Sequence, residues 1–175
     1  FNGQGELMPG FPVSTGQDPR EGAPEGLGEA FLATVAAGDL DADGSVEVVA
    51  ASLNGGIYAW SATGELLSGF PVRSLGREPE ELDDSHTYDQ GFAGAPTLED
   101  IDQDGDLEII VAGMDSRIYV LHHDGSALSG YPMELCHPEN CDGLAGARII
   151  TSATIGDMDG DGDLDMVLGG NETIS

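Results

Sequence analysis

The chain has 175 residues, of which 39% are hydrophobic, so it is long and apolar enough to bury a core as one domain. It carries 33 acidic residues against five basic ones, which gives a formal net charge of −28. This charge argues against nucleic-acid and anionic-membrane binding, because both need basic surface, and it favours bound cations.

The first segment, "GELMPGFPV" at 5–13, returns as "GELLSGFPV" at 64–72 and as "GSALSGYPM" at 125–133. Its aromatic residue moves from Phe11 to Phe70 to Tyr131, in steps of 59 and 61 residues. An acidic motif recurs in register with it, at steps of 61 and 57 residues. Two independent markers with a period near sixty predict a repeat architecture, in which no unit buries its apolar face alone.

The first complete unit, 30–72, reads as four short strands. They are "FLATVAAG", "VEVVAAS", "GIYAW" and "LLSGFPV", with a turn at "SATG". These runs are rich in Val, Ile and aromatic residues and are bounded by Gly, Asp and Asn, which is typical of strands and hairpins.

The second unit, 92–133, repeats the plan with "GAPTLED", "LEIIVAG", "RIYVL", a turn at "HHDG", and "ALSGYPM". Residues 148–175 match only the first half of a unit, and 1–13 match only the end of one. We therefore predict an all-β fold of four-stranded antiparallel β-propeller blades, present as a partial propeller. A β-sandwich would also use short strands, but it would not repeat its sequence in this way.

Each unit places an acidic loop between its first two strands: "GDLDADGSVEVV" from 38, "EDIDQDGDLEII" from 99 and "GDMDGDGDLDMV" from 156. Carboxylates at alternate positions repel one another unless a cation lies between them. We number the loop positions from the first Asp and take positions 1, 3, 5, 7 and 9 as metal ligands. The predicted ligands are Asp39, Asp41, Asp43, Ser45 and Glu47; Asp100, Asp102, Asp104, Asp106 and Glu108; and Asp157, Asp159, Asp161, Asp163 and Asp165.

Calcium suits these loops because it takes six to eight oxygen ligands, whereas magnesium prefers fewer protein ligands in a rigid octahedron. Gly at position 6 permits the sharp turn, and position 7 is expected to offer its backbone carbonyl. The loops are not EF-hands, since position 12 is Ala50, Val111 or Leu168 and cannot supply a bidentate carboxylate. We predict three Ca²⁺ sites, one in each loop.

These three loops, with the "GIYAW" and "RIYVL" strands and the "LSGFPV" close, resemble FG-GAP/VCBS repeats. "GFAGAP" at 91–96 is similar to the segment that gives the family its name. The resemblance covers nearly the whole chain. It implies calcium-binding blades of an integrin-α-like β-propeller, of the kind found in secreted adhesion proteins, lectins and polysaccharide-degrading enzymes, but it does not imply a ligand.

Two other features leave alternatives open. Cys136 and Cys141 in "CHPENC" suit a small disulfide loop, with free thiols or a metal site including His137 as the alternatives. Trp60 and the repeated aromatics could stack on sugars, but their recurrence at the period of the units favours structural packing. His122 and His123 are interpreted as exposed residues of a turn.

The function expected is a calcium-binding extracellular or cell-surface module for adhesion or for binding a glycan or protein ligand, without catalysis of its own. The alternatives are a propeller part of a secreted polysaccharide-degrading enzyme, and a structural filament or spacer subunit. Further blades, from this or neighbouring chains, are expected partners; nucleic acid and membrane insertion are not. Strand direction puts the ligand on the face opposite the metal loops, on the segments 14–29, 73–90 and 134–147, which contain Arg20, Arg73, Arg77, Asp83, Asp84, His86 and Tyr88.

Overall fold

The computed structural model describes residues 1–15, 29–75, 91–135 and 148–171. Within these residues all regular structure is β-strand, and the prediction of an all-β fold is confirmed. The described part of the chain contains no helix that is long and apolar enough to cross a membrane.

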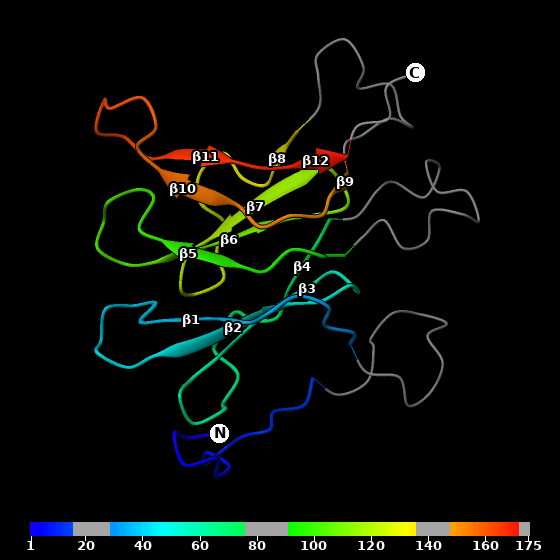
Figure 1. Ribbon diagram of the computed structural model, residues 1–175, viewed down its shortest axis with the longest axis vertical. Coiled ribbons are helices and arrows are strands. Elements are labelled where there is room, and N and C mark those ends of the chain that lie inside the picture. The colour runs from blue at the N-terminus through cyan, green and yellow to red at the C-terminus, as the bar shows by residue number, and fades with distance from the viewer. Residues whose placement is uncertain (16–28, 76–90, 136–147, 172–175) are drawn as a thin grey trace, which may run out of the picture.

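The first sheet has four strands in the order β1 (Ala36–Gly38), β2 (Glu47–Ala51), β3 (Gly56–Trp60) and β4 (Val72–Arg73) (Figure 1). All neighbours are antiparallel, with Gly38 opposite Glu47 and Val48 opposite Trp60. The first acidic loop therefore closes the β1–β2 hairpin, and its ninth position is the first residue of β2.

The second sheet repeats this order with β5 (Thr97–Glu99), β6 (Glu108–Ala112), β7 (Arg117–Leu121) and β8 (Met133–Glu134). The third unit consists of two antiparallel pairs. In one pair β10 (Thr154–Gly156) lies beside β11 (Asp165–Val167), and in the other β9 (Arg148–Ile149) lies beside β12 (Gly170–Asn171). The two four-stranded antiparallel sheets are those expected of partial propeller blades, and the described strands do not close into a barrel.

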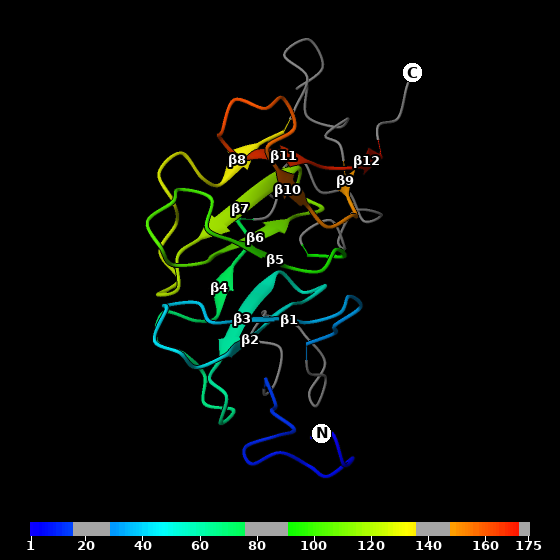
Figure 2. The same ribbon diagram turned by 60° about the vertical axis from the view of Figure 1, so that its left-hand side comes forward.

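The three units stack face to face, with residues 1–15 below the first sheet (Figure 2). Alternate residues of a strand point to opposite faces, so neighbouring isoleucines belong to different cores. Ile109 lies in the core shared with the first sheet, together with Val49 and Ile57. Ile110 lies in the core shared with the third unit, together with Ile149. Both faces of the second sheet are therefore buried.

The fourth strand is much shorter than the sequence predicts. Leu66 makes only an isolated bridge to Trp60, and the strand β4 begins at Val72. Between them Phe70 N donates to Leu67 O at 3.2 Å, and Gly69 has a φ of +89°. This turn takes Ser68–Pro71 out of the ladder. The "ALSGYPM" run behaves in the same way, with Gly130 at a φ of +93°.

The turn at Gly69 also brings the backbones of the two sheets close together. A Cβ built on Gly69 would lie 1.9 Å from the carbonyl oxygen of Asp124, in the β7 hairpin of the second sheet. Gly10 approaches Thr63, in the hairpin of the first sheet, in the same manner, at 1.6 Å. The recurrent "GFP" glycine therefore touches the hairpin of the following unit.

Candidate metal sites

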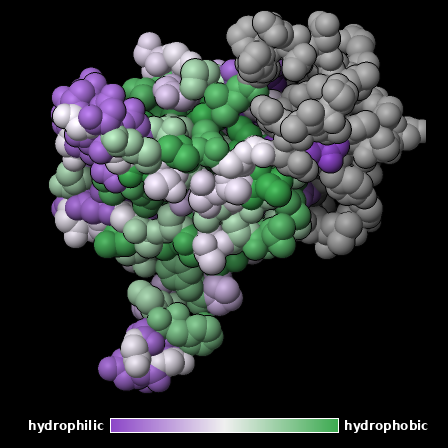
Figure 3. All heavy atoms as spheres, turned by 45° about the horizontal axis from the view of Figure 1, so that its top comes forward, coloured by the Kyte–Doolittle hydropathy of each residue, from purple (hydrophilic) through white to green (hydrophobic). Residues whose placement is uncertain are grey.

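The three acidic loops lie along one edge of the stack, on the left in Figure 1. Hydrophilic residues gather at this edge, and apolar residues cover much of the neighbouring surface (Figure 3). The repeat places each loop at the same end of its first two strands, so the stacking of the units brings the loops into one column.

Side-chain to backbone hydrogen bonds shape the first loop. Asp39 Oδ2 accepts from Gly44 N at 2.9 Å, Asp41 Oδ1 from Asp43 N at 3.3 Å, and Asp43 Oδ1 from Ser45 N at 2.7 Å. These are Asx turns, in which an Asp carboxylate caps the backbone two or more residues ahead. The backbone thus holds the alternate Asp side chains on the inside of the loop.

The other two loops use the same bonds at the same positions. Position 1 accepts from the position 6 amide at 3.1 Å in both loops. Position 3 accepts from position 5 at 3.3 and 3.1 Å, and position 5 accepts from position 7 at 3.0 and 2.9 Å. The glycine at position 6 has a φ of +91°, +105° and +97° in the three loops, as its predicted role in a sharp turn requires.

The carboxylate at position 9 has a structural role that the sequence did not reveal. One oxygen of Glu47 accepts the amide of Leu40 at 2.9 Å, and Glu108 and Asp165 accept the amides of Ile101 and Met158 at 3.1 and 2.9 Å. Glu47 and Glu108 are buried. In each loop the residue at position 9, which begins the strand after the loop, therefore holds position 2 of the same loop in place by a hydrogen bond.

Each loop brings carboxylate oxygens within 4.8 Å of one another. The first group is Asp39, Asp41 and Asp43; the second loop gives Asp100, Asp102 and Glu108; and the third gives Asp157, Asp159 and Asp165. Among the described acidic and histidine residues, no such group includes Glu47, Asp106, Asp161 or Asp163. The predicted residues at positions 1 and 3 converge in all three loops.

The second loop contains two groups whose environment favours a cation. Asp100 Oδ1 is buried and lacks a hydrogen-bond partner among the described residues. Burial raises the pKa of the Glu108 carboxyl above its usual value, and the nearby Asp102 adds to this, while the Ile101 amide and His122 oppose it. A dication there would offset both the unpaired oxygen and the buried charge.

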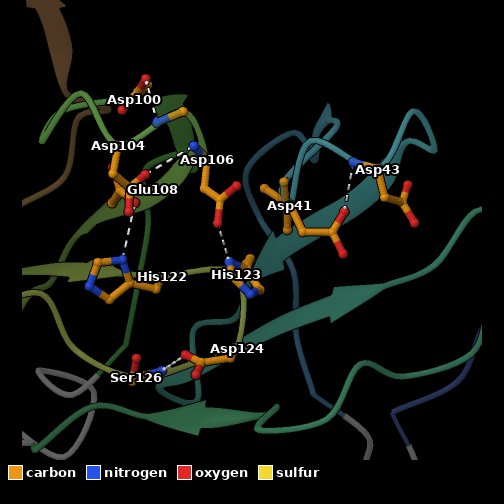
Figure 4. Close-up of polar contacts among 12 residues, drawn as sticks. Asp41, Asp43, Asp100, Asp104, Asp106, Glu108, His122, His123, Asp124 and Ser126 are labelled. Atoms are coloured by element: carbon orange, nitrogen blue, oxygen red, sulfur yellow. Dashed lines mark hydrogen bonds and ion pairs between the residues drawn. The ribbon is translucent and has the colours of Figure 1, made fainter.

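Both histidines lie in the turn and are partly exposed, as the sequence predicts, but both also contact the second loop, which it did not predict (Figure 4). His122 Nδ1 lies 3.2 Å from Glu108 Oε1, and its side chain is 26% exposed. His123 Nδ1 lies 2.9 Å from Asp106 Oδ2. The hairpin tip folds back beside the loop of its own sheet, so its side chains reach the carboxylates.

His123 also lies beside the first loop. It lines a cavity of about 260 Å³ together with Asp41, Asp43, Glu47 and Ser61. The second hairpin thus contributes to the surroundings of two acidic loops, one in its own sheet and one in the sheet before it.

Most of the recurrent aromatic residues pack against the protein interior, as their recurrence at the period of the repeat predicts. Trp60 is buried and stacks on Tyr58 with ring centroids 5.4 Å apart, and Phe70 is buried in the core between the sheets. Tyr131 packs against the core that the second sheet shares with the third unit. Phe11 lines an apolar cavity of about 600 Å³ beside Trp60.

Arg73, which the sequence predicts on the ligand-binding face, forms an ion pair and a hydrogen bond with neighbouring side chains. Its guanidinium lies 2.5 Å from the buried carboxylate of Glu29 and 2.9 Å from the Tyr58 hydroxyl. Burial and the Glu29 carboxylate raise the pKa of Tyr58 to about 12. The remaining residues predicted for that face, and the Cys136–Cys141 loop with His137, lie outside the described residues: Arg20, Arg77, Asp83, Asp84, His86 and Tyr88.

Comparison with known families supports the repeat. A family described as an FG-GAP-like repeat matches residues 100–168, from the first Asp of the second loop to just beyond the third loop. The resemblance to FG-GAP/VCBS repeats is thereby confirmed over these residues. No curated protein matches the chain.

Proposed function

We propose that the FG-GAP-like repeats of this chain form a calcium-binding β-propeller segment of an extracellular or cell-surface protein. In this proposal the module serves adhesion or the binding of a glycan or protein ligand. The observation that carries the proposal is the recurrence of one loop, with one hydrogen-bond scheme, three times along the same edge.

The donor chemistry of the loops fits calcium. The clustered side chains of the first and third loops offer only carboxylate oxygens, and calcium accepts six to eight oxygens in flexible geometry. Carbonyl groups and water would complete each shell. The Asx turns orient the carboxylates through the backbone, so an ion would meet a loop that is already shaped.

Calcium is proposed to act by stabilising the folded blades. An ion that binds only the native state adds RT ln(1 + [L]/Kd), which is about 2.7 kcal/mol per site at 100 times Kd. Three ions would also reduce the formal net charge from −28 to −22. Each ion relieves repulsion between carboxylates that the fold holds together.

The test is calorimetric titration of calcium into the chelator-treated full chain, with thermal unfolding in parallel. We expect three calcium ions per chain and a higher Tm with calcium than with chelator. Asp41→Asn, Asp102→Asn and Asp159→Asn, which keep the side-chain shape, should each remove one ion. A melting curve that does not change between millimolar calcium and chelator would contradict the proposal.

The ligand-binding role rests on the loops at the edge opposite the metals and is tested separately. Replacing residues 76–90 by a short Gly-Ser linker leaves Arg73 and its contact with Glu29 in place. We expect loss of binding to a glycan array or cell surface with the calcium response retained. Full retention of binding would place the partner elsewhere.

A further inference from the structure

The hairpins of the two complete sheets have the same backbone but different side chains. The first reads "SATG" from Ser61 and the second reads "HHDG" from His122. Gly64 N donates to Ser61 O at 2.9 Å, and Gly125 N donates to His122 O at 3.0 Å. His122 therefore occupies the position of Ser61, and an imidazole stands where the first sheet has a hydroxyl.

This imidazole joins the carboxylates of the second loop (Figure 4). A ring nitrogen of His122 and one oxygen each of Asp102 and Asp104 lie within 4.8 Å of one another. Asp102 also belongs to the group with Asp100 and Glu108, so the two groups are continuous. The second loop is the one place in the described part of the chain where such a group includes a nitrogen ligand.

Two further features indicate that the site is built to receive a cation. The Glu108 side chain is fully buried and lies 3.2 Å from His122. Asp100 Oδ1 is buried and has no hydrogen-bond partner among the described residues, which costs free energy unless a donor or a cation satisfies it. Glu108 and Asp100 therefore offer oxygen ligands in the same loop as the two carboxylates that lie near the imidazole.

Imidazole changes which metal such a site prefers. Calcium takes oxygen ligands, whereas imidazole nitrogen suits zinc, copper, nickel and iron. Zinc in particular binds histidine nitrogen and carboxylate oxygen at about 2.0–2.2 Å, commonly with four ligands. His122, Asp102 and Asp104 supply three donors of these types, and Glu108 or Asp100 could supply the fourth.

We propose that the second acidic loop and His122 together form a site for a first-row transition dication such as Zn²⁺, unlike the all-oxygen sites of the first and third loops. The inference rests on the proposed function only in that this loop binds a cation. It assigns His122 as a ligand and makes the middle site different in selectivity from its neighbours.

The test is titration of Zn²⁺ into the calcium-free, untagged full chain, comparing wild type with His122→Ser, which restores the residue of the first hairpin. Loss of a partner outside the ligand shell already costs 10–100-fold in affinity in known sites. We therefore expect His122→Ser to weaken one zinc site at least about tenfold. Its calcium affinity should stay unchanged, because calcium does not use the imidazole.

Two matched variants sharpen the assignment. His123→Ala also restores the residue of the first hairpin, and it should keep the zinc site because His123 contacts Asp106 rather than the cluster. Ser61→His should create a second zinc site, since Ser61 lines the cavity beside Asp41 and Asp43. This gain of binding keeps the proposal testable if His122→Ser folds poorly.

The outcomes separate this inference from the calcium proposal. Equal zinc affinity of wild type and His122→Ser, or no added site in Ser61→His, would overturn it while leaving the calcium titration untouched. Conversely, a zinc site that depends on His122 in a chain that binds no calcium would support it and contradict the calcium proposal. Zinc held by Cys136, His137 or Cys141 would not respond to His122→Ser and so forms a constant background.

Discussion

At the scale of single residues, the loops contain a backbone feature that the sequence only partly shows. Position 4 has a positive φ in every loop, at 55° for Ala42, 60° for Gln103 and 82° for Gly160. The sequence predicted the glycine at position 6, which is the same in all three loops. Position 4 was missed because only the third loop carries Gly there.

We expect Gln103→Gly to stabilise the protein. The left-handed conformation costs a non-glycine residue about 1–2 kcal/mol, and glycine avoids this at an entropic cost of about 0.5–1 kcal/mol. The net gain should be about 0.5–1 kcal/mol in the free energy of unfolding, measured by urea denaturation in chelator. Gln103→Ala, which keeps the strain, is the control and should have little effect.

The third loop offers the reverse experiment. Gly160 is exposed, and a Cβ built there has no neighbour within 4 Å, so Gly160→Ala tests the backbone conformation without a clash. Gly160→Ala should lower the free energy of unfolding by about as much as Gln103→Gly raises it. A neutral Gly160→Ala would show that the positive φ at position 4 carries no cost.

Asp115 is a buried acid outside the loops, and its raised pKa can be tested by measuring stability against pH. Its Oδ2 accepts the Tyr119 hydroxyl at 2.5 Å, and Tyr119 in turn accepts the amide of Leu75 at 2.8 Å. Burial raises the pKa of Asp115 above its usual value, against the opposing hydrogen bonds of Tyr119 and Arg117. The folded protein therefore binds this proton more tightly than the unfolded chain does.

A raised carboxyl pKa makes folding less favourable as pH rises from the unfolded pKa, about 3.9, to the folded pKa. Relative to Asp115→Asn, which has no proton to lose, the wild type should be favoured at acid pH. This advantage should shrink as pH rises through that window and be constant above it. Parallel stability curves for the two proteins, measured by denaturant titration across the window in chelator, would contradict the assignment.

At the scale of strands and turns, the sequence predicted the second and third strands of the two complete units well and their fourth strands poorly. "GIYAW" and "RIYVL" form β3 and β7 with the predicted bounds. "LLSGFPV" contains the apolar residues of a strand, but the turn around Gly69 interrupts it. The reason lies between the sheets, where Gly69 meets the hairpin at Asp124, a contact that local sequence cannot show.

This contact predicts different effects for two equivalent glycines. Gly69→Ala should cost the strain of a positive φ, about 1–2 kcal/mol, and a further 1–3 kcal/mol, roughly, from overlap with the Asp124 backbone. Gly130→Ala is the matched control, because it has a φ of +93° but no neighbour within 4 Å of a built Cβ. It should cost only the first amount, as measured by urea denaturation; equal losses would show that the contact between the sheets has no energetic weight.

At the scale of the whole molecule, the charge predicts how salt acts on stability. With chelator present, raising NaCl from 0.01 to 0.15 M shortens the Debye length from about 30 to about 8 Å and screens the repulsion within a chain of charge −28. The Tm should therefore rise with NaCl. Calcium at equal ionic strength should raise it further; an equal rise with NaCl alone would contradict specific calcium sites.

The candidate sites were predictable in so far as they lie within one loop. The alternation of Asp predicted that positions 1 and 3 converge, and they do, because the loop's own backbone brings them together. His122 and the anchoring bond of Glu47 to Leu40 were missed. Both depend on which residues the hairpins set opposite each other, and that register appears only when the strands pair.

One backbone hydrogen bond joins neighbouring acidic loops directly. Leu40 O, at position 2 of the first loop, accepts from Leu107 N, at position 8 of the second, at 2.9 Å. The same Leu40 donates its amide to Glu47, so one residue connects the position 9 carboxylate of the first loop to the backbone of the second loop. If both loops bind an ion, ordering of the first loop would reduce the conformational entropy that the second loop loses on binding. Their calcium isotherm should be steeper than that of two independent sites, so this edge would respond to calcium as a threshold rather than in proportion.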